Sequence, residues 1–224
     1  MVNQERTVKT LALVLLILTI LWVVLTGISM SRVKSSWTPH DFMKWISDPD
    51  IIFVLNYINA TLLTVVAVLL FSSLFVYLKT EGETAALAGL VFVPIYGLMN
   101  LFCYSIQISV VPSIVRTVLD HSGPGYMAFQ FIQASPDSLT GFINGLAYGI
   151  LGIPSIIYGR LLFRKSKKYS GTFLAMNGIS CFLGVIGYVT GNPILSRGTM
   201  IGGILFLISL FFMLFEFRKR GDRD

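Results

Sequence analysis

The stretch IIFVLNYINATLLTVVAVLLFSSLFVYL, residues 51–78, contains no Asp, Glu, Lys, Arg or His. The hydrocarbon core of a bilayer is about 30 Å thick, and about 20 helical residues cross it. Lipid offers the backbone no hydrogen-bond partner, so a spanning segment must pair its own N–H and C=O groups, as a helix does. The stretch therefore predicts a membrane-spanning helix.

Five further stretches have the same apolar character, and the composition agrees with them. Hydrophobic residues make up 54% of the 224 residues and charged residues 12%, against about 25% charged residues in soluble domains. We expect an all-α fold, a polytopic transmembrane bundle of six helices, in a single domain over residues 1–224. The expected spans are 10–29, 51–78, 85–111, 139–163, 172–190 and 199–217.

Lys and Arg residues are divided unevenly between the two sides of the predicted bundle. Twelve of the 17 fall on one side: two before the first span, one in the second loop, five in the fourth loop and four in the tail. Because cytoplasmic loops hold the excess of Lys and Arg, we expect a multi-pass protein of the cell membrane with both termini cytoplasmic. This bias accounts for the net charge of +6 without a nucleic-acid partner.

Three loop and terminal features lead to further expectations. The basic cluster of the fourth loop either only sets the orientation or also contacts anionic lipid head groups; its members are Arg160, Arg164, Lys165, Lys167 and Lys168. The first span is expected to stay as an anchor, with signal-peptide cleavage as the alternative, because its apolar run exceeds the usual length of about 7–15 residues. The loop 111–138 is apolar, so we expect it to lie on the bundle or in the interface, with Ser135–Ser138 capping the fourth span.

Small residues predict where helices approach one another closely, because lipid provides no hydrophobic force between helices. Glycines recur at intervals of four at the start of the fourth span and again at the start of the last one. The predicted packing residues are Gly141, Gly145, Gly149, Gly198 and Gly202. The fourth span is therefore our candidate for the centre of the bundle.

Uncharged polar side chains inside the spans are the best pointers to function, since polar groups in a membrane usually have a role. With 100° per residue, Asn100, Tyr104 and Gln107 share one face of the third span. The full set is Asn56, Asn59, Asn100, Tyr104, Gln107, Asn144 and Tyr148. Either these groups hydrogen-bond between helices and hold the bundle in register, or they line an outward-facing pocket for a neutral or amphipathic molecule.

The sequence offers little for catalysis. It lacks the common motifs of hydrolases, zinc proteases and phosphate-binding loops, which favours a protein that is not an enzyme and binds no cofactor. The only histidines, His40 and His121, lie in outer loops next to Asp41 and Asp120. They are weak candidates for metal ligands, because their spacing matches no known ligand pattern.

The order of features resembles a family of bacterial and archaeal six-helix membrane proteins known only as a domain of unknown function. The similarity is carried by the exit Tyr77-Leu78-Lys79, the segment Tyr158–Ser166 and the glycine-containing helix from Phe173 to Gly187. Members often have an acidic residue well inside the last helix; here that residue is Glu216, near its end. The number of helices also resembles the substrate-capturing subunits of vitamin and metal importers. Neither resemblance implies a catalytic residue.

These observations favour a membrane protein that binds or translocates a small neutral or lipid-like molecule, and so a transporter. The first alternative is a packing or regulatory subunit that associates with another membrane protein or with itself. The second is a metal-dependent enzyme on the outer face.

Overall fold

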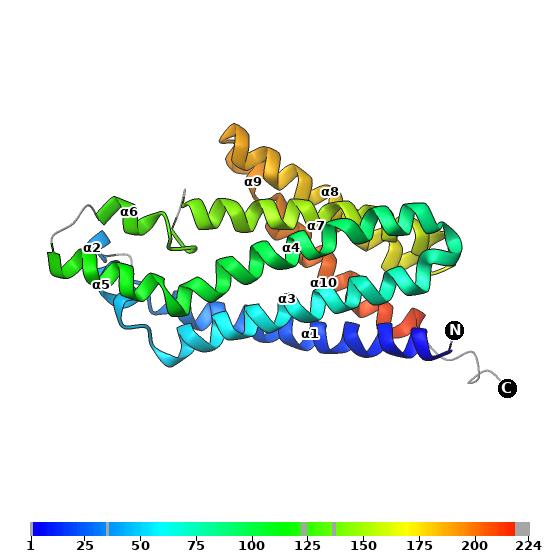
Figure 1. Ribbon diagram of the computed structural model, residues 1–224, viewed down its shortest axis with the longest axis horizontal. Coiled ribbons are helices and arrows are strands. Elements are labelled where there is room, and N and C mark those ends of the chain that lie inside the picture. Colours follow the sequence, from blue (N-terminus) through cyan, green and yellow to red (C-terminus); the bar gives the residue numbers. More distant parts are fainter. Residues whose placement is uncertain (1, 35, 122–124, 136–137, 218–224) are drawn as a thin grey trace. The chain divides into compact units, whose positions relative to one another are not determined.

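The computed structural model describes residues 2–34, 36–121, 125–135 and 138–217 (Figure 1). All regular secondary structure in these ranges is helical, which confirms the all-α prediction. Six of the helices are long and apolar enough to cross a membrane, so the chain is a multi-pass membrane protein. They are α1 (Val2–Ser31), α3 (Ile51–Leu78), α4 (Glu83–Ser109), α7 (Leu139–Arg164), α8 (Lys168–Thr190) and α10 (Gly198–Glu216).

The helices agree with the expected spans except at some ends. α1 begins at Val2, well before residue 10, because its polar first turns are helical although hydropathy alone does not mark them. Shorter helices lie between the long ones: α2 (Pro39–Ser47), the 3₁₀ turn η1 (Lys79–Glu81), α5 (Val111–His121), α6 (Gly125–Phe129) and α9 (Pro193–Ser196). Part of the expected cap of the fourth span, residues 136 and 137, lies outside the described residues. Ser138 Oγ does accept a hydrogen bond from Gly141 N at 3.0 Å.

The chain divides into two compact units, which are described separately. Unit 1 comprises Met1–Ile17, Val65–Leu98 and Gly145–Asp224, and unit 2 comprises Leu18–Thr64 and Met99–Asn144. The single domain expected from the sequence stays a prediction.

In unit 1, glycines bring the backbones of α7 and α8 into direct contact. A Cβ added at Gly159 would lie 2.6 Å from the carbonyl oxygen of Gly171, and one added at Gly152 would lie 2.8 Å from that of Gly178. Any side chain here would meet backbone, which cannot rotate away. α7 also has the most buried apolar segment of the six spans, with 56% of it inside the protein. That it is the centre of the bundle stays a prediction.

α8 packs equally closely against α10 in the same unit. A Cβ at Gly198 would lie 2.6 Å from Gly184 N, and one at Gly202 would lie 2.6 Å from Cys181 Sγ. Asn177 Nδ2 donates to Gly202 O at 2.9 Å, which adds an interhelical hydrogen bond. α8 is therefore held on one side by α7 and on the other by α10.

A carboxylate completes the start of α8. Glu216, at the end of α10, accepts hydrogen bonds from Tyr169 N and Ser170 N, each at 3.0 Å, and from Ser170 Oγ at 2.6 Å. The first N–H groups of a helix have no partner within it, and a negative charge there also interacts favourably with the helix dipole. The last residue of one span thus caps the first turn of another.

A second set of contacts joins α1 and α3 to this end of unit 1. Lys167 Nζ donates to the Glu216 carbonyl and lies 3.5 Å from Glu5 Oε1. The Tyr77 hydroxyl donates to the same Glu5 oxygen at 3.0 Å. These bonds explain why the polar first turns of α1 are ordered as helix.

In unit 2, the segments between the long helices pack on those helices. Val111, Val115, Ala128 and Ile132 are buried in one apolar cluster with Phe53 of α3. Trp45 of α2 meets the Phe53 ring at 5.3 Å, edge to face. The described part of the loop between α4 and α7 therefore lies on the unit, as its apolar composition predicts.

Two aspartates stabilise helix starts in unit 2. Asp41 forms a capping box with Thr38 at the start of α2, and the hydrogen bonds from the Thr38 side chain and backbone hold the pKa of Asp41 below its ordinary value. Asp50 Oδ1 accepts from Phe53 N at 2.9 Å, and Arg32 pairs with its other oxygen. Burial acts to raise the pKa of Asp50, but the hydrogen bonds from Phe53 and Arg32 outweigh it and lower that pKa.

Replacing Gly159 with Ala should destabilise unit 1 by several kcal/mol, because the new methyl group must push apart two helix backbones. Gly203→Ala on α10 is the matched control, since nothing lies within 4 Å of its added Cβ. The control should be neutral or stabilise the protein by up to about 1 kcal/mol, because Ala favours helix over Gly. Thermal unfolding in detergent measures both; equal effects of the two substitutions would contradict the proposed contact.

The stability contributed by Asp50 should depend on pH. Its pKa is lowered in the folded protein, so its contribution is present above the unfolded value of about 3.8 and is lost as pH falls through the folded value. Asp50→Asn should lower the melting temperature near neutral pH. The difference from the native protein should begin to shrink near pH 4 and disappear only below the lowered pKa of folded Asp50. The exposed neighbour Asp48→Asn is the control. A difference that persists unchanged at low pH would contradict the assignment.

Candidate functional site

Two asparagines of α3 bind α1 within unit 2. Asn56 Oδ1 accepts a hydrogen bond from Thr26 Oγ1 at 3.2 Å. Asn59 Nδ2 donates to the backbone carbonyl of Leu18 at 2.9 Å. Both amides are buried, and these hydrogen bonds give each of them a partner on α1. Thr26 did not stand out in the sequence, although it is a hydroxyl inside a span.

Gln107 of α4 holds the segment that precedes α7. Its Nε2 donates to Phe131 O at 2.9 Å and to Cys103 O at 3.2 Å, and its Oε1 accepts from Gln133 N at 3.1 Å. The side chain is fully buried. One amide therefore satisfies two backbone groups in a segment that has no regular structure of its own.

Tyr104 and Asn144 connect α4 to the first turns of α7. The Tyr104 hydroxyl donates to Asn144 Oδ1 at 3.4 Å, and Asn144 Nδ2 lies 3.5 Å from the same hydroxyl. These distances are long for hydrogen bonds. The Tyr104 ring also packs on Tyr57 of α3, with centroids 6.3 Å apart. Tyr104 therefore contacts both α3, through its ring, and α7, through its hydroxyl.

Asn100 differs from the other amides. Its side chain is completely buried, and neither Oδ1 nor Nδ2 has a hydrogen-bond partner within the described ranges. Asn100 shares a face of α4 with Cys103, Tyr104 and Gln107, which all bond to the segment 130–144. An unpaired amide in this setting costs about 1–3 kcal/mol, and such a group needs an explanation.

Asn59 has a second unpaired group near the same depth. Its Oδ1 has no partner among the residues that the structure describes. Asn59 lies two residues beyond Tyr57 along α3, and Asn100 lies four residues before Tyr104 along α4. With 1.5 Å per residue, both lie about 3–6 Å from the Tyr57–Tyr104 pair toward the turn that joins α3 and α4.

Tyr148, the last of the predicted pocket residues, belongs to unit 1. Its ring lies 6.0 Å from that of Tyr96. The structure therefore collects Asn56, Asn59, Asn100, Tyr104, Gln107 and Asn144 in unit 2, and Tyr148 is described with unit 1. That these residues bind a ligand stays a prediction.

The glycines predicted to pack differ in what they meet. An added Cβ would lie 2.7 Å from Tyr188 Cε2 at Gly145 and would collide with Val185 at Gly149. At Gly141 it would lie 2.8 Å from Ser138 Oγ, so that glycine faces the cap of its own helix. Gly198 and Gly202 meet α8, as described above.

The basic cluster between α7 and α8 is partly engaged within the protein. Lys165 Nζ donates to Tyr77 O at 2.9 Å and to Thr80 Oγ1 at 3.0 Å, and Lys167 binds Glu5 and Glu216. The other members, Arg160, Arg164 and Lys168, are exposed. Contact of the cluster with anionic lipid stays a prediction.

The histidines lie apart from any cluster of ligands. His40 on α2 and His121 at the end of α5 are both exposed, and His121 Nδ1 lies 3.1 Å from Thr117 O. Across the described residues, no group of three or more His, Cys, Asp or Glu side chains could hold a metal ion. Nothing in this part of the protein therefore adds ligands to the two histidines.

Replacing Gln107 with Leu should cost about 1–3 kcal/mol, because Phe131 O and Gln133 N would lose their partner in a buried setting. Ser105→Ala on the exposed side of α4 is the control, since its hydroxyl bonds only within α4. Hydrogen exchange of residues 126–135 should rise in the Gln107 variant alone. Unchanged exchange there would show that Gln107 does not hold this segment.

The polar groups inside the spans of unit 2 are amides, hydroxyls, phenols, an indole and a thiol, without a carboxylate, amine or imidazole. They can donate and accept hydrogen bonds, but they lack the acid–base pairs that general acid–base catalysis uses. Any function of these groups is therefore inferred from their burial and their contacts.

No family model matches the chain. No curated protein and no solved structure matches it either.

Proposed function

We propose that this multi-pass membrane protein binds a small uncharged molecule in unit 2, through hydrogen bonds to Asn100, and does not transform it. The observation that carries this proposal is the complete burial of Asn100 with both amide atoms unpaired. The neighbouring amides of Gln107 and Asn56 have protein partners at ordinary distances. Asn100 is therefore the amide on this face of α4 whose donor and acceptor are both available to a ligand.

The chemistry of Asn100 defines the ligand class. An amide presents one carbonyl acceptor and two N–H donors side by side, so a matching ligand carries a donor next to an acceptor, as amides and hydroxyl compounds do. A charged ligand would be disfavoured, because unit 2 offers no opposite charge inside its spans. The unpaired Oδ1 of Asn59 supplies a further acceptor for a ligand donor.

The distribution of Lys and Arg supports an orientation for this site. With both termini in the cytoplasm of the cell membrane, the α2 and α5 segments of unit 2 lie on the outer side. A ligand would then reach Asn100 from outside, which fits a capture or transport protein. The described helices α5 and α6 lie over the ends of α3 and α4 in unit 2. They would have to move away for the ligand to enter.

A second function is favoured by a separate observation. Asn56, Asn59 Nδ2 and Gln107 already hydrogen-bond to protein groups, as expected if the polar residues only hold helices in register. In that case the chain is a packing or regulatory subunit of a membrane complex. The two functions differ in the role of Asn100, which binds a ligand in the first function and binds none in the second.

The substitution Asn100→Leu distinguishes the ligand-binding function from the subunit function. If Asn100 binds a ligand, a defined small molecule copurifies with the native protein and the variant loses it, with affinity reduced at least about tenfold, or about 1.4 kcal/mol. The empty variant should melt at the same or a higher temperature, because Leu removes an unpaired amide. Native mass spectrometry with small-molecule extraction gives the first result, and thermal unfolding in detergent gives the second.

Ser105→Ala is the control and should keep the ligand. A native protein that is empty, with a variant that melts at a higher temperature, would leave Asn100 without a ligand and contradict the proposal. Stoichiometric recovery of another membrane protein with an empty native chain would favour the subunit function instead.

A further inference from the structure

The five cations of the basic cluster between α7 and α8 fall into two groups. Lys165 Nζ lies 3.4 Å from Glu81 Oε1, and Lys167 Nζ lies 3.5 Å from Glu5 Oε1, so these two hold unit 1 together. The other three members are Arg160, Arg164 and Lys168. They are exposed, and within the described ranges none of them has a hydrogen bond, an ion pair or a ring contact. Three cations of one cluster are therefore free for an outside partner.

The two arginines lie on α7 beside its line of contact with α8. A Cβ added at Gly159 would lie 2.6 Å from the carbonyl oxygen of Gly171, so Gly159 marks the side of α7 that faces α8. Arg160 follows Gly159 by about 100° around the helix, and Arg164 lies about 40° further on. Both side chains therefore point outward from the helix pair, one turn apart.

Lys168 lies beside the same line of contact on α8. It lies about 60° around the helix from Gly171, in the same sense of rotation as Arg160 from Gly159. Because α7 and α8 run antiparallel, rotations of the same sense lead to the same side of the pair. The three free cations thus share one outward surface, which we call the basic face (Arg160, Arg164 and Lys168).

No carboxylate in the described part of the protein neutralises the basic face. α7 and α8 contain neither Asp nor Glu. The carboxylates of Glu5 and Glu81 are paired with the inward lysines, and that of Glu216 caps α8. Glu83, at the start of α4, is exposed and forms no ion pair with the three cations. The basic face therefore calls for an anion from outside the chain.

Apolar surface adjoins the basic face on both helices. On α7, Phe163 lies beside the two arginines, and on α8, Ile179 lies three turns beyond Lys168 on the same face. Each of these two side chains is 52% exposed. In a membrane such side chains face acyl chains, while long Arg and Lys side chains reach the head groups. A molecule that fits both surfaces has an anionic head and an apolar tail.

The chemistry of the three cations points to phosphate. A guanidinium is always charged, and its fork of N–H donors matches two phosphate oxygens. Lys168 adds a compact positive charge. A zwitterionic lipid also carries a phosphate, but it brings its own cation, so three unpaired cations favour a head group with a net negative charge.

We propose that the basic face binds the phosphate of an anionic glycerophospholipid. Arg160 and Arg164 hydrogen-bond to the phosphate oxygens, Lys168 adds its charge, and an acyl chain lies along Ile179. The site is independent of the one at Asn100, because α7 from Gly145 onward and all of α8 belong to unit 1, whereas Asn100 belongs to unit 2.

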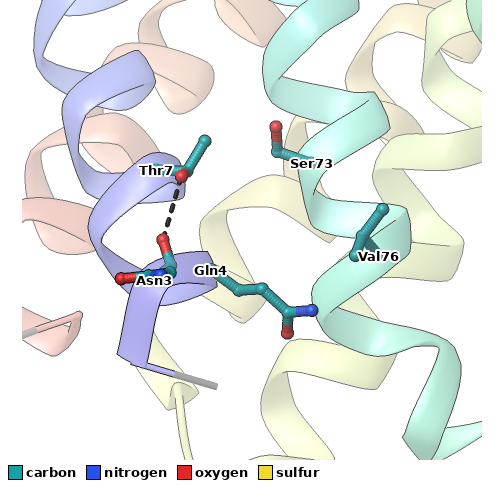
Figure 2. A pocket seen from close by; sticks show the side chains of 5 residues that line it. All are labelled: Asn3, Gln4, Thr7, Ser73 and Val76. Atoms are coloured by element: carbon teal, nitrogen blue, oxygen red, sulfur yellow. Dashed lines mark hydrogen bonds between the residues drawn. The ribbon is translucent and has the colours of Figure 1, made fainter.

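A second pair of cations in unit 1 supplies a control with the same charge. Arg6 on α1 and Lys79 after α3 are both exposed. Figure 2 shows the hollow between the two segments to which they belong, and its lining contains no charged residue. Replacing Arg6 and Lys79 with Gln removes two positive charges, as replacing Arg160 and Arg164 does, but on other helices.

The test uses the full chain in detergent, with lipid binding measured by native mass spectrometry. Phosphatidylglycerol should bind at least about tenfold more tightly than phosphatidylcholine with the same acyl chains. The double variant Arg160→Gln/Arg164→Gln should lose most of this preference, because both phosphate donors are gone. The control Arg6→Gln/Lys79→Gln should keep it.

Melting temperatures separate binding from folding. Without lipid, the Arg160→Gln/Arg164→Gln variant should melt at the native temperature, because neither arginine bonds to another described residue. Phosphatidylglycerol should raise the melting temperature of the native protein and of the control but not of this variant, since a ligand that binds only the folded state stabilises it.

Four results would overturn the proposal. They are equal binding of the two lipids by the native protein, an unchanged preference in the Arg160→Gln/Arg164→Gln variant, an equal loss in the control, and binding of glycerol phosphate as tight as that of phosphatidylglycerol. The third would mean that only net charge matters, and the fourth that the face holds a soluble phosphate compound. Asn100→Leu should leave phosphatidylglycerol binding unchanged, so failure of either site is recognised separately.

Discussion

Where α7 meets α8, two helix backbones touch, and the rest of unit 1 depends on that contact. Lipid does not drive helices together by hydrophobic burial, so their association rests on dispersion between close surfaces and on hydrogen bonds. Gly159 against Gly171 and Gly152 against Gly178 leave no room for a side chain between the two backbones. α10 then packs on the other side of α8 through Gly198 and Gly202. Glu216 consequently reaches the first turn of α8, and Lys167 reaches Glu5.

Unit 2 is held by a different kind of interaction. Its helices carry aromatic rings and amides at their contacts, and these amides bond both to backbone groups and to other side chains. Amide side chains are directional, so they determine register, whereas glycine contacts determine distance. A polar, directional interior is also what a binding site requires, which is why Asn100 stands out in this unit.

The sequence was sufficient for the spans, because each needs only apolar length. It did not distinguish Gly141, which faces the cap of its own helix, from the glycines whose added Cβ would meet another helix. It could not identify the partner of Asn59, since Leu18 contributes a backbone carbonyl that no residue pattern marks. The position of Glu216 near a helix end was evident, but its role as a cap for α8 depends on how α8 and α10 pack. The unpaired state of Asn100 was equally inaccessible, because it is a property of what surrounds the side chain and not of the residue.

The contacts of Glu5 have a consequence for how the protein is made. Glu5 enters the membrane surface with the first helix, but Lys167 follows only after α7, and Glu216 is among the last residues of the last span. During synthesis the first turn of α1 therefore waits for the first 167 of the 224 residues before its ion pair can form. A chain that stops before α10 leaves the start of α8 without the Glu216 carboxylate, and it leaves Lys167 without the Glu216 carbonyl. The charged end of unit 1 thus becomes complete only after α10 has packed on α8.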